Sequence, residues 1–322
     1  MKLDYASPYD GFSRTPLRVG FALLCALIFL GETHSVASMA RDTHYTPPAG
    51  SLYFPPSNPV FAWGIFALIL GGLGAIALDK RSLPAGIWTL CWMSVLSYWK
   101  RELAGTPSRN SFFPGVMLLG WVLGLAWARA VAGAEADKPE GRAFRERLAE
   151  AGAMACIAAG YTSSALSKLL ASGFDWINPH QVRWLILSQE PLGHWSWLTS
   201  YRNLVLENPS VAWFSAFMTI VIEGGGFFLL FGPRLRLFWT GMIWALHLNI
   251  IFLCVMPYVE PMSLLLLFSV PWPRIFKRPR VEDPLAARAP DILRPDMPDK
   301  MWILLTAIIV LCWVLPIGWR AG

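Results

Sequence analysis

The chain is dominated by apolar runs that are longer than a strand or helix of a soluble domain needs, such as residues 59–78 and 211–231. A hydrocarbon core of about 30 Å takes about 20 apolar residues per helix, and only helices or closed barrels satisfy their backbone groups there. These runs are continuous rather than alternating, which favours helices. Composition agrees, since 55% of the 322 residues are hydrophobic and 15% are charged. We therefore predict an all-α fold, a polytopic transmembrane helix bundle in a single membrane domain over residues 1–322.

Nine spans are predicted, and the eighth is short because Pro261 and Pro271 bound it. That span is tilted, re-entrant or half of a longer broken element. The spans cover residues 17–34, 59–78, 85–99, 112–132, 151–171, 211–231, 236–256, 260–272 and 301–318.

The first span has two interpretations. Residues 19–31 form a signal-like apolar core, and Ser38-Met39-Ala40 offers a small-residue cleavage site. The leader before the core is long and carries Asp4 and Asp10, whereas a signal peptide usually starts with a short basic region. This favours a retained helix.

The distribution of lysine and arginine predicts the orientation. With the N-terminus in the cytoplasm, eighteen of these residues fall in inner segments and seven in outer segments, and the C-terminus lies outside. The cluster of Lys100, Arg101 and Arg109 runs against this topology. The net charge of +6 comes largely from inner loops such as 273–300, so it does not indicate nucleic-acid binding.

The outer segments 35–58 and 172–210 are the long ones, and the second is rich in Trp. We expect short amphipathic helices and ordered loops there, which lie in the membrane interface and roof an outward-facing cavity. All five cysteines fall inside predicted spans without CxxC or zinc spacing, so no metal is predicted.

Charged and polar residues inside the spans are the candidates for function, because each is costly in a bilayer. Lys168 lies within about one turn of the outer end of the fifth span, where a snorkelling lysine that reaches the headgroups is one interpretation. The other is a functional lysine, made available as a neutral base by desolvation. Tyr161 lies two turns earlier on the same helical face, and Asp175-Trp176 follow soon after.

Glu223 lies deeper, in a span where three glycines follow it and let another backbone approach closely. It either packs neutral against a neighbouring helix or takes part in a site. His247 and Asn249 are two residues apart, so they project about 200° apart and cannot both face one small ligand.

Three stretches together resemble a known protein family: "GYTSSALSKLLASGFDWINP", "GGFFLLFGPRLRLFWTGMIWALHLNIIFLCVMPYV" and Trp272-Pro273-Arg274. In order and spacing they resemble the membrane module of the vitamin K-dependent gamma-glutamyl carboxylases, within the horizontally transferred transmembrane domain group. The resemblance implies that Lys168 is the base that deprotonates a reduced quinone. It makes Lys168 and His247 the catalytic candidates, with a substrate or cofactor pocket formed by Tyr161, Trp176, Glu223, Asn249 and Asn110.

Four features depart from the family pattern, one of them a spacing from His247 to Asn249 that is one residue shorter than expected. Asn110 stands near a position where the family has a histidine, and Ser167 replaces the first lysine of a pair. No large extramembrane domain follows the last span before Gly322. Carboxylation of protein glutamates is therefore not implied.

Two main functions follow as expectations. The first is an enzyme of a bacterial inner membrane that uses Lys168 on a lipophilic quinol, or on a secreted peptide or lipid at the outer face. The second is a non-catalytic maturation or export partner, or a scaffold, for a secreted peptide or an extracytoplasmic protein. A transporter is weaker, because no internal repeat is visible.

Overall fold

The structure is a computed structural model that describes residues 7–40, 58–104, 112–138, 141–190, 193, 195–256 and 258–280. Every regular element in these ranges is helical, which confirms the all-α class. The chain divides into two compact units. The N-terminal unit comprises the described parts of 7–154 and 270–280, and the C-terminal unit comprises those of 155–269. A single domain over the whole chain stays a prediction.

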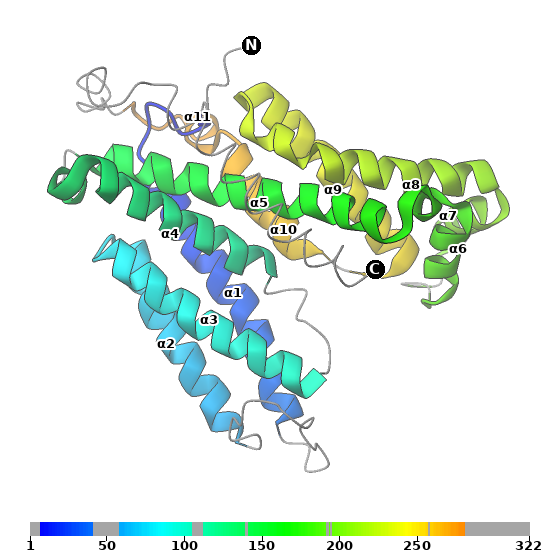
Figure 1. Cartoon of the computed structure of the whole chain (residues 1–322), viewed down its shortest axis with the longest axis horizontal. Helices are drawn as coiled ribbons and strands as arrows, with labels where there is room; N and C mark the ends of the chain where they lie inside the picture. Colours follow the sequence, from blue (N-terminus) through cyan, green and yellow to red (C-terminus); the bar gives the residue numbers. More distant parts are fainter. Residues whose placement is uncertain are drawn as a thin grey trace. The chain divides into compact units, whose positions relative to one another are not determined.

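In the N-terminal unit, α1 (Thr15–Met39), α2 (Pro59–Ala77) and α3 (Ser82–Ala104) pack against one another, and α4 (Phe112–Ala132) packs on α3 (Figure 1). The short helices η1 (Gly133–Asp137) and α11 (Trp272–Ile275) also belong to this unit. Helix α5 (Arg142–Ser172) starts here and continues into the C-terminal unit.

The C-terminal unit holds η3 (Gly173–Ile177), α6 (Pro179–Leu187), α7 (Ser196–Glu207), α8 (Pro209–Gly224), η4 (Gly225–Leu230), α9 (Pro233–Cys254) and α10 (Val259–Ser269). Three of its helices, α6, α8 and α9, begin with a proline at the first helical position, where the missing N–H costs nothing. At α6, Asn178 also caps the helix, because its side chain accepts a hydrogen bond of 3.0 Å from the His180 N–H.

Helix α2 of the N-terminal unit starts in the same way, at Pro59. In both units the proline therefore marks where an apolar run becomes helical.

Five helices among the described residues are long and apolar enough to cross a membrane, which makes this a membrane protein. They are α1, α2, α4, α9 and the continuous segment Pro209–Leu230 formed by α8 and η4. Helices also lie over the predicted spans 85–99 and 151–171 and over most of 260–272, but α3 and α5 are less apolar over a span's length and α10 is shorter, so these three are outside that group. The predicted span 301–318 lies outside the described residues.

Helix α5 begins at Arg142, nine residues before the predicted span, because its first turns are held by ion pairs rather than by apolar packing. The buried Glu150 carboxylate accepts hydrogen bonds from Arg14 Nε at 2.8 Å and from Ser7 Oγ at 2.5 Å.

The same carboxylate affects Tyr9. Burial, with the nearby charge of Glu150, raises the pKa of the Tyr9 phenol, which therefore stays protonated.

A second set of charges joins the turn after α2 to α5. Arg18 of α1 forms an ion pair with Glu146. Asp79 accepts from Arg145 Nη2 at 2.8 Å and lies 3.0 Å from Arg142 Nε. The three arginines were counted from the sequence among the inner positive charges, and the structure shows that they also form ion pairs within the N-terminal unit.

Lys100 of α3 forms an ion pair of 2.6 Å with Glu32 of α1, whose carboxylate is fully buried. Sequence analysis missed Glu32, although it falls inside the first predicted span. Lys100 is one of the residues that disagree with the predicted orientation. Glu32 compensates its charge, so Lys100 counts for less in the positive-inside distribution.

These contacts predict that α1 stays attached in the mature protein. Cleavage after Ala40 would remove the Arg14 and Arg18 partners of two buried carboxylates and separate Lys100 from Glu32. Intact-mass spectrometry of protein purified from membranes is expected to find α1 present. A mass lower by residues 1–40 would contradict the prediction.

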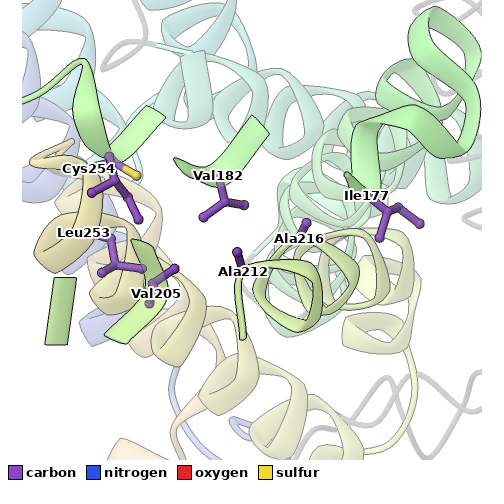
Figure 2. Packing of buried hydrophobic residues seen from close by; sticks show 8 residues of the cluster. Ile177, Val182, Val205, Ala212, Ala216, Leu253 and Cys254 are labelled. Carbon is purple, nitrogen blue, oxygen red and sulfur yellow. The ribbon is translucent and has the colours of Figure 1, made fainter. Parts of the chain in front are cut away.

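Within the C-terminal unit, α6 and α7 pack on α8 and α9 around a small apolar cluster (Figure 2). Val182 of α6 and Val205 of α7 meet Ala212 and Ala216 of α8 and Leu253 of α9. Short helices therefore lie where the sequence predicted them, and their place in a roof over an outer face stays a prediction.

Candidate functional site

Lys168 of α5 forms an ion pair with Glu223 of α8, within the C-terminal unit. Its ammonium also donates a hydrogen bond of 3.2 Å to Ser164 Oγ, one turn earlier on α5. The Lys168 side chain is 24% exposed and that of Glu223 is 10% exposed, so the pair is largely removed from solvent. Two charged residues that sequence analysis treated separately are therefore one unit.

The end of α5 brings an aromatic ring to the same lysine. Gly173 has a φ of +58°, a left-handed conformation that ends the helix and turns the chain into η3. Trp176 of η3 then lies with its ring centroid 4.9 Å from Lys168 Nζ. This cation–π contact adds to the attraction between the ammonium and Glu223.

Tyr161 and His247 form a second polar pair, between α5 and α9. The Tyr161 hydroxyl lies 2.6 Å from His247 Nε2, and the tautomer of the ring decides which group donates. The ring of Tyr258 lies 5.2 Å from that of His247, centroid to centroid. Lys168 lies within electrostatic range of His247, and Glu223 within range of Tyr161, so the two pairs form one cluster.

One atom of this cluster lacks a hydrogen bond. His247 is 5% exposed, and its Nδ1 has no hydrogen-bond partner within the described part of the chain. A buried polar atom left in this way costs about 1–3 kcal/mol. The cluster therefore keeps an unused donor or acceptor beside the Tyr161 hydrogen bond.

The three glycines after Glu223 let α8 and η4 approach α5. A Cβ added at Gly226 would lie 2.6 Å from Tyr161 Cβ, and one at Gly224 would touch Ala165 at 3.6 Å. Gly225 faces the ring of Trp239, whose Nε1 donates to the Ile222 carbonyl at 3.0 Å. This close approach, expected from the sequence, is what brings Glu223 within reach of Lys168.

Asn249 faces a different neighbour from His247, as the 200° separation predicts. Its Oδ1 accepts from the hydroxyl of Tyr201 on α7. Burial raises the pKa of Tyr201, so the phenol stays protonated and can donate. Asn249 therefore holds α7 on α9 and forms no described bond to the Lys168 cluster, while Asn110 lies outside the described residues.

Sequence analysis missed Arg202, which it counted only as an outer-loop charge. Arg202 is 7% exposed and donates to the carbonyls of Leu253 at 2.9 Å, Ile186 at 2.7 Å and Gln189 at 2.8 Å. The signal was present, because Leu198, Arg202 and Val205 are spaced four and three residues apart and so share one helical face.

No family model, curated protein or solved structure matches this chain. The resemblance to the carboxylase membrane module therefore stays an expectation carried by the residues alone. In the described ranges, no three His, Cys, Asp or Glu side chains come together as a metal site.

Chemically, the cluster combines an amine, a carboxyl, a phenol and an imidazole in an apolar setting. Proton transfer from Lys168 to Glu223 would turn the ion pair into a neutral amine and a neutral carboxylic acid, which suits a low-dielectric environment. A neutral amine is a base and a nucleophile. The arrangement can therefore accept and return a proton.

Proposed function

We propose that this chain is an integral membrane protein whose Lys168–Glu223 pair exchanges a proton with the hydroxyl group of a lipophilic hydroquinone. The observation that carries the proposal is the meeting of Lys168, Glu223 and Trp176 beside the Tyr161–His247 pair. Buried groups that titrate and lie together are typical of catalytic sites rather than of lipid-facing helices.

The proton path starts within the ion pair. Lys168 passes its proton to Glu223, and the neutral amine then takes the proton of a hydroquinone hydroxyl, which leaves a hydroquinone anion beside the new ammonium. The ammonium and the Trp176 ring hold that anion and its aromatic ring. His247 Nδ1 is placed to hydrogen-bond a second polar atom of the ligand.

We also propose a membrane topology for the chain. The chain has nine spans in a bacterial inner membrane, with the N-terminus in the cytoplasm, the C-terminus outside and α6 and α7 in an outer roof. The lysine and arginine distribution supports this orientation. A secreted peptide or an extracytoplasmic protein is the proposed partner at the outer face.

The test is binding of a lipophilic hydroquinone to detergent-purified protein. We expect saturable, pH-dependent binding that Lys168→Met abolishes, because the substitution keeps the length of the side chain and removes its amine. Lys100→Met is a matched control, since it removes a lysine from another buried Lys–Glu pair. Equal binding by the native protein and Lys168→Met, or loss with both variants, would contradict the proposal.

A non-catalytic scaffold is the second candidate function. The observation that favours it is that Glu223 already compensates the charge of Lys168, as in an ion pair whose role is to fix α5 to α8. A scaffold predicts that Lys168→Met lowers thermal stability, while the native protein binds no hydroquinone. The same samples therefore decide between the two functions.

A further inference from the structure

The depth of the Lys168–Glu223 pair can be read along α8 rather than along α5. Helix α8 and η4 form one candidate span, Pro209–Leu230. Glu223 follows Pro209 by fourteen residues and precedes Leu230 by seven. At 1.5 Å per helical residue, Glu223 lies about 21 Å along the axis from the start of the span. A hydrocarbon core is about 30 Å thick, so this distance is well inside it.

Helix α5 does not accompany α8 over its whole length. It ends at Ser172, one turn after Lys168. The first turns of α8 are met instead by Ile177 and α6, whose Val182 packs with Ala212 and Ala216 (Figure 2). The end of α5 therefore does not by itself mark a membrane surface, so the depth of the lysine is better measured along α8.

We propose that the Lys168–Glu223 pair lies well inside the hydrocarbon core, below the layer formed by α6 and α7, and opens sideways onto lipid. The proposal differs from the sequence-based expectation, which puts Lys168 within about one turn of the outer end of its span. The proposal rests on the membrane part of the proposed function and is independent of the hydroquinone.

The sideways opening follows from exposure on α5. The Lys168 side chain is 24% exposed, and its neighbours Leu166 and Leu170 are 37% and 54% exposed. These two leucines are two residues from Lys168, so they project from the opposite side of α5 and show that this helix is exposed there at the same depth. The opening at the lysine itself is the exposed part of its own side chain. Inside the hydrocarbon core such a surface contacts acyl chains.

Two consequences distinguish this arrangement from a snorkelling lysine. A snorkelling lysine reaches headgroups and water, and its partner is solvent or phosphate. A lysine inside the hydrocarbon core is stabilised by a protein carboxylate, which Glu223 provides. A molecule that reaches this pair from the side has to be dissolved in the bilayer and must bring a polar group to it.

Spin labels on single cysteines in lipid vesicles test the depth. In a chain whose five native cysteines are replaced, we compare Leu170→Cys with Glu207→Cys, an exposed position at the end of α7, directly before α8. The label at 170 is expected to collide with oxygen several-fold more, relative to a water-soluble nickel chelate, than the label at 207. Leu166→Cys provides a second reading of the same depth.

The outcomes are separable. A lipid-like oxygen-to-nickel ratio at 170 or 166, with a water-like ratio at 207, supports the proposal whether or not a hydroquinone binds. Equal, water-like ratios at all three positions would place Lys168 at the surface and overturn it. Loss of hydroquinone binding with lipid-like ratios would overturn only the proposed function.

Discussion

Replacing Glu150 by alanine is expected to destabilise the N-terminal unit by about 3–5 kcal/mol, the usual cost of breaking a buried ion pair from one side. The Glu150 side chain is fully buried, and it accepts hydrogen bonds from Arg14 Nε and Ser7 Oγ. Arg14 is itself buried and would lose one of its carboxylate partners, with Asp10 at 2.7 Å as the other. Equilibrium unfolding in detergent, followed by tryptophan fluorescence, measures the loss.

Two controls separate burial from charge in this experiment. Arg129→Ala breaks an ion pair whose arginine is 61% exposed and lies 4.0 Å from Asp137, so it is expected to cost less than about 1 kcal/mol. A double change of Arg14 and Glu150 to methionine removes both charges and is expected to recover part of the stability. If Glu150→Ala costs no more than Arg129→Ala, the network is not what holds α5 to α1.

The helices could be predicted from the sequence because each depends on a local pattern. Eight of the spans predicted from apolar runs overlap described helices. Prolines at residues 59, 209 and 233 mark where three of those helices begin. Helix α5 begins nine residues before its predicted span, because hydropathy marks only the apolar part of a helix. The charged residues in the first turns of α5 form ion pairs within the protein, and hydropathy does not show such pairing.

The members of the site could be predicted, and their pairing could not. Lys168, Glu223 and His247 stand out as polar residues in apolar runs. Which residue pairs with which depends on helix packing, since Lys168 and Glu223 are 55 positions apart and Tyr161 and His247 are 86 apart. The depth of Lys168 in the membrane depends on the same packing, because it follows from where Glu223 lies along α8.

Replacing Gly120 by alanine is the second change with a large expected effect. Gly120 and Gly124 of α4 are one turn apart and face the backbone of α5, the small-xxx-small arrangement that lets membrane helices approach closely. A Cβ at Gly120 would lie 2.6 Å from the carbonyl carbon of Gly152, and one at Gly124 would lie 2.7 Å from Ala149 Cα. Backbone atoms cannot rotate away as a side chain can, so α4 must move from α5.

We expect Gly120→Ala to cost about 1–3 kcal/mol, the range for overpacked interiors, and the double change with Gly124→Ala to cost more. Gly115→Ala is the matched control, because Gly115 lies in the same helix with no neighbour within 4 Å of an added Cβ. Alanine there is expected to be neutral or to stabilise, since glycine disfavours a helix by about 0.5–1 kcal/mol. Equal unfolding midpoints for the variants at 115 and 120 would show that α4 and α5 do not meet through these glycines.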